Sequence, residues 1–273
     1  GQLIDEKYRI MRLIGEGGMG AVYEAEHAFL GKRVAIKFLA AEFAHNADAV
    51  ARLYREAQAA ARIGQENICE VMDVGRSQAG APYIVMQLLQ GKPLSAVIAE
   101  SGALSIGRVV DIGSQMLEAL EATHRAGIVH RDMKPDNVFL TRVAGRDDFV
   151  KLLDFGISKV RGGAASRTGR TNLTQAGTIL GTPAYMSPEQ ARGETDVDGR
   201  ADVWAVGIIA YEMLTGRVPF EGDNYNKIMY QVLAGPIVRP RAVREAVSSE
   251  LDGVVMRALE RDVDRRWSTA AEF

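Results

Sequence analysis

The feature that most constrains the fold of this chain is a change of sequence pattern at residue 91. Residues 8–90 consist mainly of short apolar runs separated by glycine and polar turns, a pattern typical of β-strands. One alanine-rich segment, 46–63, has apolar residues at helical spacing. After residue 91 the spacing becomes helical, starting with 105–127, which opens on a serine and closes on a glycine. The sequence therefore predicts an α+β fold with a small β-rich N-terminal lobe and a larger, mainly helical C-terminal lobe.

These two lobes set the expected domain organisation. A chain of 273 residues is long enough for lobes with sizeable cores. We expect a single domain over 1–273, with an N-lobe over about 1–88, a hinge over about 87–92 and a C-lobe over about 92–273. The best candidate for a membrane span, VWAVGIIAYEML at 203–214, is shorter than the about 20 residues that a span takes. It predicts a buried core helix instead.

The net charge and the cysteine content indicate which classes of partner this chain is expected to bind and in which compartment it is expected to lie. The formal net charge is −2, which argues against a general nucleic-acid-binding face. The single cysteine, Cys69, lies in an apolar run and predicts a buried structural thiol from a reducing compartment. We therefore expect a cytoplasmic domain that contacts neither nucleic acid nor membrane. A membrane anchor outside this chain remains compatible with that expectation.

A glycine-rich segment near the start, GEGGMGAV at 15–22, has the spacing of a loop that covers phosphates. Glycine lets backbone N–H groups come close to phosphate oxygens. A dinucleotide-binding fold uses a similar pattern, but it requires a helix directly after the glycines. The following residues, 21–27, are strand-like, which disfavours that alternative. A flexible hairpin with no ligand is the other interpretation of this segment by itself.

A lysine inside an apolar strand marks a second candidate site. Lys37 ends the run VAIK at 34–37, where an unpaired ammonium group would be costly to bury. It either reaches water from an edge strand or binds phosphates beside a carboxylate. Glu56, in the middle of the predicted helix, is the best candidate for that carboxylate.

The most informative segment is HRDMKPDNVFL, 130–140, which is followed by LLDFGISK at 152–159. Asp132 and Asn137 lie on what must be a loop, because Pro135 blocks a helix there. Asp154 ends an apolar strand. Asparagine and aspartate oxygens suit Mg²⁺, and Asp132 is placed to accept a proton from a hydroxyl group.

Taken together, these segments resemble the protein kinase domain and, within that superfamily, the bacterial eukaryotic-like (Hanks-type) serine/threonine kinases. The resemblance covers nearly the whole chain. It adds GTPAYMSPEQ at 181–190 and DVWAVGIIAYEMLTGRVPF at 202–220 to the motifs above. Lys134 and Thr182 favour the serine/threonine class, so the implied partners are proteins that carry serine or threonine hydroxyls.

The resemblance implies a site for ATP with Mg²⁺, or with Mn²⁺ in its place, between the lobes. Lys37 would bind the phosphates and pair with Glu56, Asn137 and Asp154 would hold the metal, and Asp132 and Lys134 would serve the transfer step. Met86 would be the gatekeeper beside the adenine. The other implied ATP contacts are Ile14, Gly15, Gly17, Gly18, Gly20, Val22, Ala35, Gln87, Leu89 and Leu140.

The resemblance also implies structural and regulatory roles. Glu189 would pair with Arg266, and Asp202 would brace the catalytic loop. Residues 154–189 would form the activation segment, whose phosphate would pair with Arg131 after autophosphorylation. Related bacterial kinases often activate through N-lobe contacts, so the resemblance also implies an N-lobe dimer as a candidate assembly. The candidate phosphorylation sites are Thr174 and Thr178, followed by Thr171 and Thr168.

Three departures and two alternatives remain. Ser187 replaces the usual alanine, GQENI at 64–68 replaces the common His-Pro-Asn-Ile, and the hinge QLLQG at 87–91 lacks the frequent Glu-Tyr pair. None of these changes removes a catalytic group. The alternatives are an ATP-binding pseudokinase without turnover and a small-molecule kinase of the aminoglycoside-phosphotransferase type, which lacks the GTPAYMSPE segment.

Overall fold

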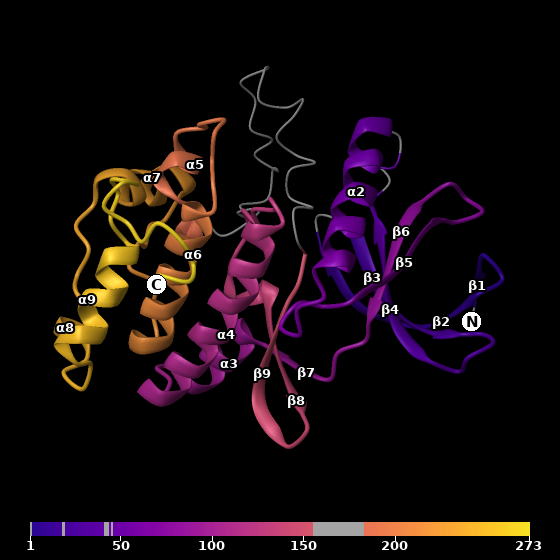
Figure 1. Ribbon diagram of the computed structural model, residues 1–273, viewed down its shortest axis with the longest axis horizontal. Helices are drawn as coiled ribbons and strands as arrows, with labels where there is room; N and C mark the ends of the chain where they lie inside the picture. Colours follow the sequence, from indigo (N-terminus) through magenta and orange to yellow (C-terminus); the bar gives the residue numbers. More distant parts are fainter. Residues whose placement is uncertain (1, 18–19, 41–43, 45, 155–182) are drawn as a thin grey trace.

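The chain folds into a β-rich N-terminal part and a mainly helical C-terminal part, as the change of pattern predicts. The computed structural model describes residues 2–17, 20–40, 44, 46–154 and 183–273. The N-terminal sheet lies at one end of the long axis and the last helices lie at the other (Figure 1). The segments α4, β8 and β9 lie between them. This arrangement brings residues from both parts of the sequence to the middle of the molecule.

The N-terminal sheet has six antiparallel strands in the spatial order β1-β2-β3-β4-β6-β5. The antiparallel pair of β2 and β3 contains the glycine-rich segment. Gly20 has a φ of +136° and an added Cβ would lie within 2 Å of the Phe38 carbonyl oxygen, so this position requires glycine. The strands are β1 (Leu3–Ile4), β2 (Tyr8–Gly17), β3 (Gly20–His27), β4 (Arg33–Leu39), β5 (Val71–Arg76) and β6 (Pro82–Gln87).

Helix α2 (Ala47–Ile63) packs on this sheet through the face that its spacing predicts. The apolar residues of that face are Val50, Leu53, Ala57 and Ala60, and all four are buried. Leu53 and Ala57 share a cluster with Leu39 and Ile84 of the sheet. Burying apolar side chains of this kind stabilises by about 1.5–3 kcal/mol each for the larger ones, which holds the helix against the sheet.

A second sheet of three strands, in the order β7-β8-β9, follows in the C-terminal part. The predicted helix at 105–127 forms as α4, with Ser105 accepting a hydrogen bond at its N-terminus from Arg108 N. Pro135 begins a short 3₁₀ turn, Pro135–Asn137, where the sequence predicted only a loop; proline fits the first position of a helical turn because no N–H is needed there. The elements are β7 (Gly91–Pro93), α3 (Leu94–Ser101), α4 (Ile106–Arg125), β8 (Val138–Val143) and β9 (Arg146–Leu152).

Helix α6, which is the predicted core helix, packs against α4, α8 and α9. Its residues from Ala201 to Leu214 are buried except for a partly buried Glu212. Trp204 stacks on Phe220 with ring centroids 5.9 Å apart. Among the helices that the structure describes, none has the length and apolar composition needed to span a membrane. The helices are α5 (Pro188–Ala191), α6 (Arg200–Thr215), α7 (Tyr225–Ala234), α8 (Pro240–Val243) and α9 (Ser249–Ala258).

Candidate active site

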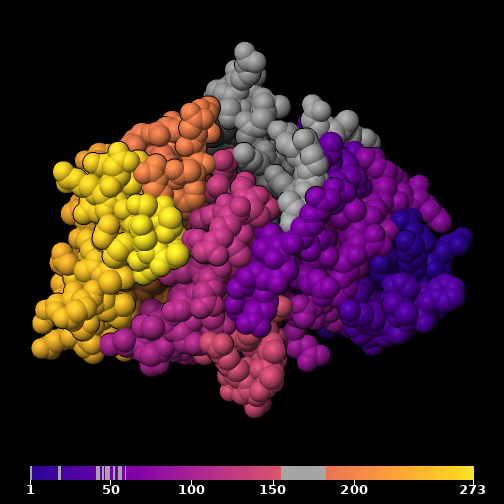
Figure 2. All heavy atoms as spheres, in the orientation of Figure 1, coloured from indigo at the N-terminus to yellow at the C-terminus, as the bar shows by residue number. Residues whose placement is uncertain are grey.

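A cleft of about 1060 Å³ is lined by residues of both the N-terminal sheet and the C-terminal part. Figure 2 shows these two parts as opposite ends of one continuous surface. Most of the residues expected at a nucleotide site line this cleft, although they come from segments far apart in the sequence. Those that line it are Ile14, Gly15, Gly17, Gly20, Val22, Ala35, Lys37, Met86, Gln87, Leu89, Arg131, Asp132, Lys134, Asn137, Asp154 and Asp202.

Among the described residues that were expected to contact ATP, Leu140 does not line the cleft, so the expectation for it is wrong. Its side chain is 5% exposed and belongs to the main apolar core. Its neighbour Phe139 lines the cleft instead. Successive residues of a strand point to opposite faces, so an assignment shifted by one position along β8 reverses the direction of the side chain.

A direct ion pair between Lys37 and Asp154 crosses the cleft. Lys37 lies in the middle of β4, between Val22 of β3 and Ile84 of β6. Its Nζ is 2.6 Å from Asp154 Oδ1. The Lys37 side chain is buried, whereas Asp154 is 28% exposed to the cleft. The Asp154 carboxylate, which follows β9, therefore offsets the free-energy cost of burying the Lys37 ammonium group.

The pairing expected between Lys37 and Glu56 falls outside the described residues. Helix α2 includes position 56, but the structure does not describe the Glu56 side chain. Gly18 and the candidate phosphorylation sites also lie outside the described residues. Those candidates are Thr168, Thr171, Thr174 and Thr178.

The loop before β8 brings three of the predicted polar groups together. Asn137 Nδ2 donates to the Asp132 carbonyl oxygen at 2.7 Å and to Asp132 Oδ2 at 3.1 Å. Lys134 Nζ lies 3.3 Å from the same Oδ2. These contacts fix the Asp132 carboxylate at the cleft wall. Because the Asn137 amide nitrogen serves Asp132, its amide oxygen is the atom suited to a metal ion.

Asp202 of α6 holds this loop through hydrogen bonds to its backbone. Its two carboxylate oxygens accept the backbone N–H groups of His130 and Arg131, each at 2.8 Å. His124 Nε2 lies 2.8 Å from Asp202 Oδ2. Arg131 has a φ of +63°, a conformation that a non-glycine residue holds only when its surroundings enforce it. The bracing carboxylate provides that constraint.

Gln190 also holds this loop, a role that none of the motifs considered above predicted. Its Nε2 donates to the Arg131 carbonyl oxygen at 2.9 Å. Its Oε1 accepts the Ser187 N–H, and Ser187 Oγ accepts the Gln190 N–H, which together form a capping box at the start of α5. The S-x-x-Q spacing at 187–190 is the signal that would have indicated the box.

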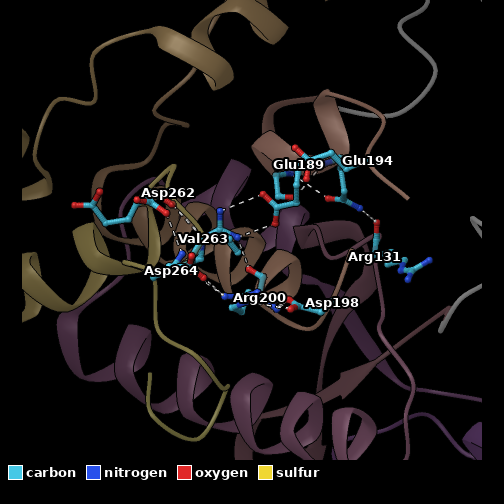
Figure 3. Close-up of polar contacts among 12 residues, drawn as sticks. Arg131, Glu189, Glu194, Asp198, Arg200, Asp262, Val263 and Asp264 are labelled. Atoms are coloured by element: carbon cyan, nitrogen blue, oxygen red, sulfur yellow. Dashed lines mark hydrogen bonds and ion pairs between the residues drawn. The ribbon is translucent and has the colours of Figure 1, made fainter. Parts of the chain in front are cut away.

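Glu189 and Arg266 form another ion pair, in which both residues are buried. Arg266 Nη1 and Nη2 lie 2.8 and 3.2 Å from the two carboxylate oxygens. Figure 3 shows Glu189 within a group of polar contacts that also includes Arg200 and Asp198. Burial by itself would raise the pKa of Glu189, but the hydrogen bonds and charge of Arg266 outweigh it and hold the pKa below its ordinary value.

The hinge side of the cleft offers backbone groups and an unreactive thiol. Gln87 N–H donates to the Glu70 carbonyl oxygen at 2.9 Å, so the Gln87 carbonyl is the group that can serve a ligand. Cys69 Sγ lies 3.8 Å from that carbonyl oxygen. Burial raises the pKa of the Cys69 thiol to about 12, so it is neutral at physiological pH.

The donor set suits a divalent metal that is shared with phosphate groups. Among the described residues, no group of three or more His, Cys, Asp or Glu side chains could hold a metal ion alone. The cleft instead offers Asp154 and the amide oxygen of Asn137. Magnesium is commonly bound by one or two such protein oxygens, with phosphate oxygens and water completing its coordination. The residues present therefore fit a metal that arrives with a nucleotide.

Comparison with known proteins connects this cleft to one family. Residues 8–272 match the family model described as "Protein kinase domain". The serine/threonine-protein kinase Pkn1 of Myxococcus xanthus is 44% identical over 266 residues, which cover 97% of this chain and 37% of that protein. The serine/threonine-protein kinase PknB of Mycolicibacterium smegmatis is 38% identical over 275 residues, which cover 100% of this chain and 42% of that protein. This chain thus spans about two fifths of the length of these relatives.

A solved structure supports the same likeness. The PknI kinase domain of Mycobacterium tuberculosis has a TM-score of 0.75 and 29% sequence identity to this chain. The match covers 100% of this chain and 94% of that one. The likeness therefore extends over both the N-terminal sheet and the helical part.

Proposed function

This chain belongs to the protein kinase family, and on that premise we propose that it transfers the γ-phosphoryl group of ATP to serine and threonine hydroxyl groups of proteins. Family membership implies ATP, a divalent metal and protein substrates. The observation that carries the proposal is the convergence of Lys37, Asp132 and Asp154 on one cleft. In this proposal, residues 1–88 and 92–273 form the two lobes that clamp the nucleotide, and 87–92 form the hinge.

Each polar group of the cleft has a distinct role in the proposed transfer. Asp132 orients the substrate hydroxyl and accepts its proton as the oxygen attacks the γ-phosphorus. The bond between that phosphorus and the β–γ bridging oxygen breaks, and ADP leaves with the electron pair. Lys134, 3.3 Å from the Asp132 carboxylate, offsets negative charge on the group in transfer.

The nucleotide-binding roles follow from the ion pair across the cleft. Lys37 Nζ binds the α- and β-phosphates, and Asp154 and Asn137 supply oxygen ligands to Mg²⁺ or Mn²⁺. The metal, when bound, neutralises charge on the phosphate oxygens. Phe139, in place of Leu140, packs against the adenine from the C-terminal side, because it lines the cleft and Leu140 does not.

We include autophosphorylation of residues 154–189 in the proposal. Arg131 Nε is buried and has no hydrogen-bond acceptor among the described residues, while Arg131 Nη2 donates to the Val197 carbonyl oxygen at 2.7 Å. A phosphate on Thr174 or Thr178 would provide an acceptor for this guanidinium group. Contact between the N-lobes of two copies is the arrangement that we propose for activation.

The experiment that tests the proposal compares two aspartate-to-asparagine variants. Purified chain is incubated with Mg²⁺ and radiolabelled ATP, with and without a generic protein substrate. Asp132→Asn should reduce phosphate incorporation by about 10²–10⁴-fold, because it removes the general base. Asp147→Asn makes the same chemical change at a side chain that is 78% exposed and pairs with Arg142, and it should leave the rate unchanged.

Each outcome is informative. Equal labelling of substrate by the wild type and Asp132→Asn would contradict the role of Asp132. Binding of ATP without any transfer would support the pseudokinase alternative, and transfer to an aminoglycoside but not to protein would support the small-molecule alternative. Phosphopeptide mapping that finds no phosphate within 154–189 would contradict autophosphorylation there.

A further inference from the structure

Two buried carboxamide side chains, Asn67 and Gln115, meet where the N-terminal part joins the C-terminal part. Asn67 lies in the connection between α2 and β5 and is 2% exposed. Gln115 lies in α4 and is 3% exposed. Asn67 Nδ2 donates to Gln115 Oε1 at 3.1 Å. Buried polar groups of this kind are costly unless every donor and acceptor has a partner.

The pair is fully hydrogen-bonded, and its main partner is strand β9. Gln115 Oε1 accepts the Val150 N–H at 3.0 Å, and Asn67 Nδ2 donates to the Val150 carbonyl oxygen at 3.0 Å. Gln115 Nε2 donates to the Asp148 carbonyl oxygen at 3.0 Å and to Asp111 Oδ2 at 3.1 Å. All four hydrogen-bonding positions of the Gln115 amide are therefore used.

Among the described residues, no strand pairs with the second edge of β9, and these contacts take its place. One edge of β9 pairs with β8. On the other edge, the two carboxamides satisfy Val150, and the backbone of the α2–β5 connection satisfies Leu152. Leu152 N–H donates to the Asn67 carbonyl oxygen at 2.7 Å, and the Leu152 carbonyl oxygen accepts Cys69 N–H at 2.9 Å. A side-chain amide suits this role because it offers the same donor and acceptor as a peptide group.

The strand held in this way ends two residues before Asp154. Leu153 N–H donates to the Asn137 carbonyl oxygen at 2.9 Å, which continues the anchoring toward the metal-binding residues. The α2–β5 connection, which holds the other edge of β9, begins directly after α2, the helix that contains residue 56. A shift of β9 along its axis would therefore displace Asp154 relative to Lys37, which is held in β4.

We propose that Asn67 and Gln115 are positioning residues for phosphoryl transfer: their carboxamides fix β9 so that Asp154 presents its carboxylate to the metal and to Lys37. This inference rests on the proposed function, in which Asp154 is a metal ligand. Partners that orient a metal ligand change metal affinity or activity by about 10–100-fold when they are removed. Loss of the pair should therefore raise the Mg²⁺ concentration that the reaction needs more than it raises KM for the protein substrate.

The test uses Gln115→Met, which keeps an unbranched side chain of similar length and removes all of its hydrogen bonds. The Mg²⁺ concentration for half-maximal rate should rise about tenfold or more, with a smaller change in KM for the protein substrate. Asn67→Asp is a second variant that keeps the shape of the side chain, removes the donor to Gln115 and Val150, and places a carboxylate oxygen against their two acceptor oxygens. The double variant should be no worse than the more impaired single variant, because both residues belong to one network.

The matched control is Asp252→Asn in α9, which disturbs another buried polar contact at the far end of the helical part. Asp252 is 2% exposed and accepts hydrogen bonds from Arg239 Nε and Arg241 N–H at 2.6 and 3.0 Å. The Asp252→Asn variant should have a lower Tm than the wild type and the same Mg²⁺ concentration for half-maximal rate. If the control changes that concentration as much as Gln115→Met does at a matched loss of Tm, the pair is merely structural and the proposal fails.

A readout that does not depend on activity is the exchange of backbone amide hydrogens. Val150 and its neighbours through Asp154 should exchange faster in Gln115→Met and Asn67→Asp than in Asp252→Asn. Unchanged protection at Val150 would overturn the inference. If the wild type proves unable to transfer phosphate, the proposed function fails, and amide exchange together with Mg²⁺-dependent ATP binding still decides whether the pair positions Asp154.

Discussion

Two ion pairs of this molecule, Lys37–Asp154 in the cleft and Glu189–Arg266 in the helical part, use similar groups for different purposes. Each joins segments far apart in the sequence, and each includes a buried cation. Within the part of the chain that the structure describes, Lys37 contacts a carboxylate that is 28% exposed, at 2.6 Å. Arg266 makes two contacts to a buried carboxylate and also donates to the carbonyl oxygens of Glu260 and Arg200, at 3.1 and 2.6 Å.

The difference shows how a fold separates an exchangeable charge from a fixed one. A lysine ammonium group is a compact charge on a flexible side chain, so it can exchange a carboxylate partner for phosphate oxygens. A guanidinium group with several fixed partners loses too many hydrogen bonds to be displaced. The guanidinium of Arg266 also lies 5.2 Å from the ring centroid of Trp204, inside the core around α6. We therefore expect the first pair to control activity and the second to control stability.

The largest effect is expected from Lys37→Met. The rate of phosphoryl transfer should fall by about 10²–10³-fold, because a charge that stabilises the phosphates is lost. The thermal unfolding temperature should change little, since Asp154 can be solvated in the cleft. Steady-state kinetics and a melting curve on the same preparation measure both effects. A Lys37→Met variant that melts far below the wild type would contradict the expectation that this pair controls activity and not stability.

The matching change in the other pair, Arg266→Met, should destabilise the fold by about 3–5 kcal/mol, because it leaves the Glu189 carboxylate buried without its partner. Adding Glu189→Gln should recover part of this loss. Urea unfolding followed by circular dichroism measures the free energies. Equal stability of the wild type and Arg266→Met would show that this pair is not the fixed one.

A smaller, pH-dependent effect should distinguish Glu189 from exposed carboxylates. Its pKa is lowered in the folded state, so its contribution to stability is complete above the ordinary glutamate pKa and is lost as pH falls through the folded value. The free energy of unfolding of the wild type should therefore fall more steeply than that of Glu189→Gln on acidification below about pH 4. Parallel pH profiles for the two proteins would contradict the lowered pKa.

The smallest effect is expected from Cys69→Ala, a change in the wall of the same cleft that leaves both ion pairs intact. The thiol is neutral, because burial raises its pKa to about 12, and it acts only as a small apolar group. The substitution should cost at most about 1 kcal/mol of stability and leave the transfer rate within about twofold. A tenfold loss of rate would mean that this side chain takes part in nucleotide binding.

Several features of the fold and the site were predictable, either from local sequence or from the family resemblance. Helix α2 forms over its predicted residues because its apolar spacing creates one buried face. The Glu189–Arg266 pair and the bracing by Asp202 also agree with what the family resemblance implies. The assignment of Leu140 was wrong because the motif specified a strand but not which alternate residue faces the cleft, where Phe139 lies.

By itself, the sequence determined which segments become strands and helices, because propensity, periodicity and capping act over a few neighbouring residues. It also determined the chemical groups available to the site. Only the tertiary structure decided that Lys37 meets Asp154 across 117 positions of sequence and that Asn67 and Gln115 complete the edge of β9. Such partners are chosen by packing, since a buried donor or acceptor must bond with whatever group the fold places beside it.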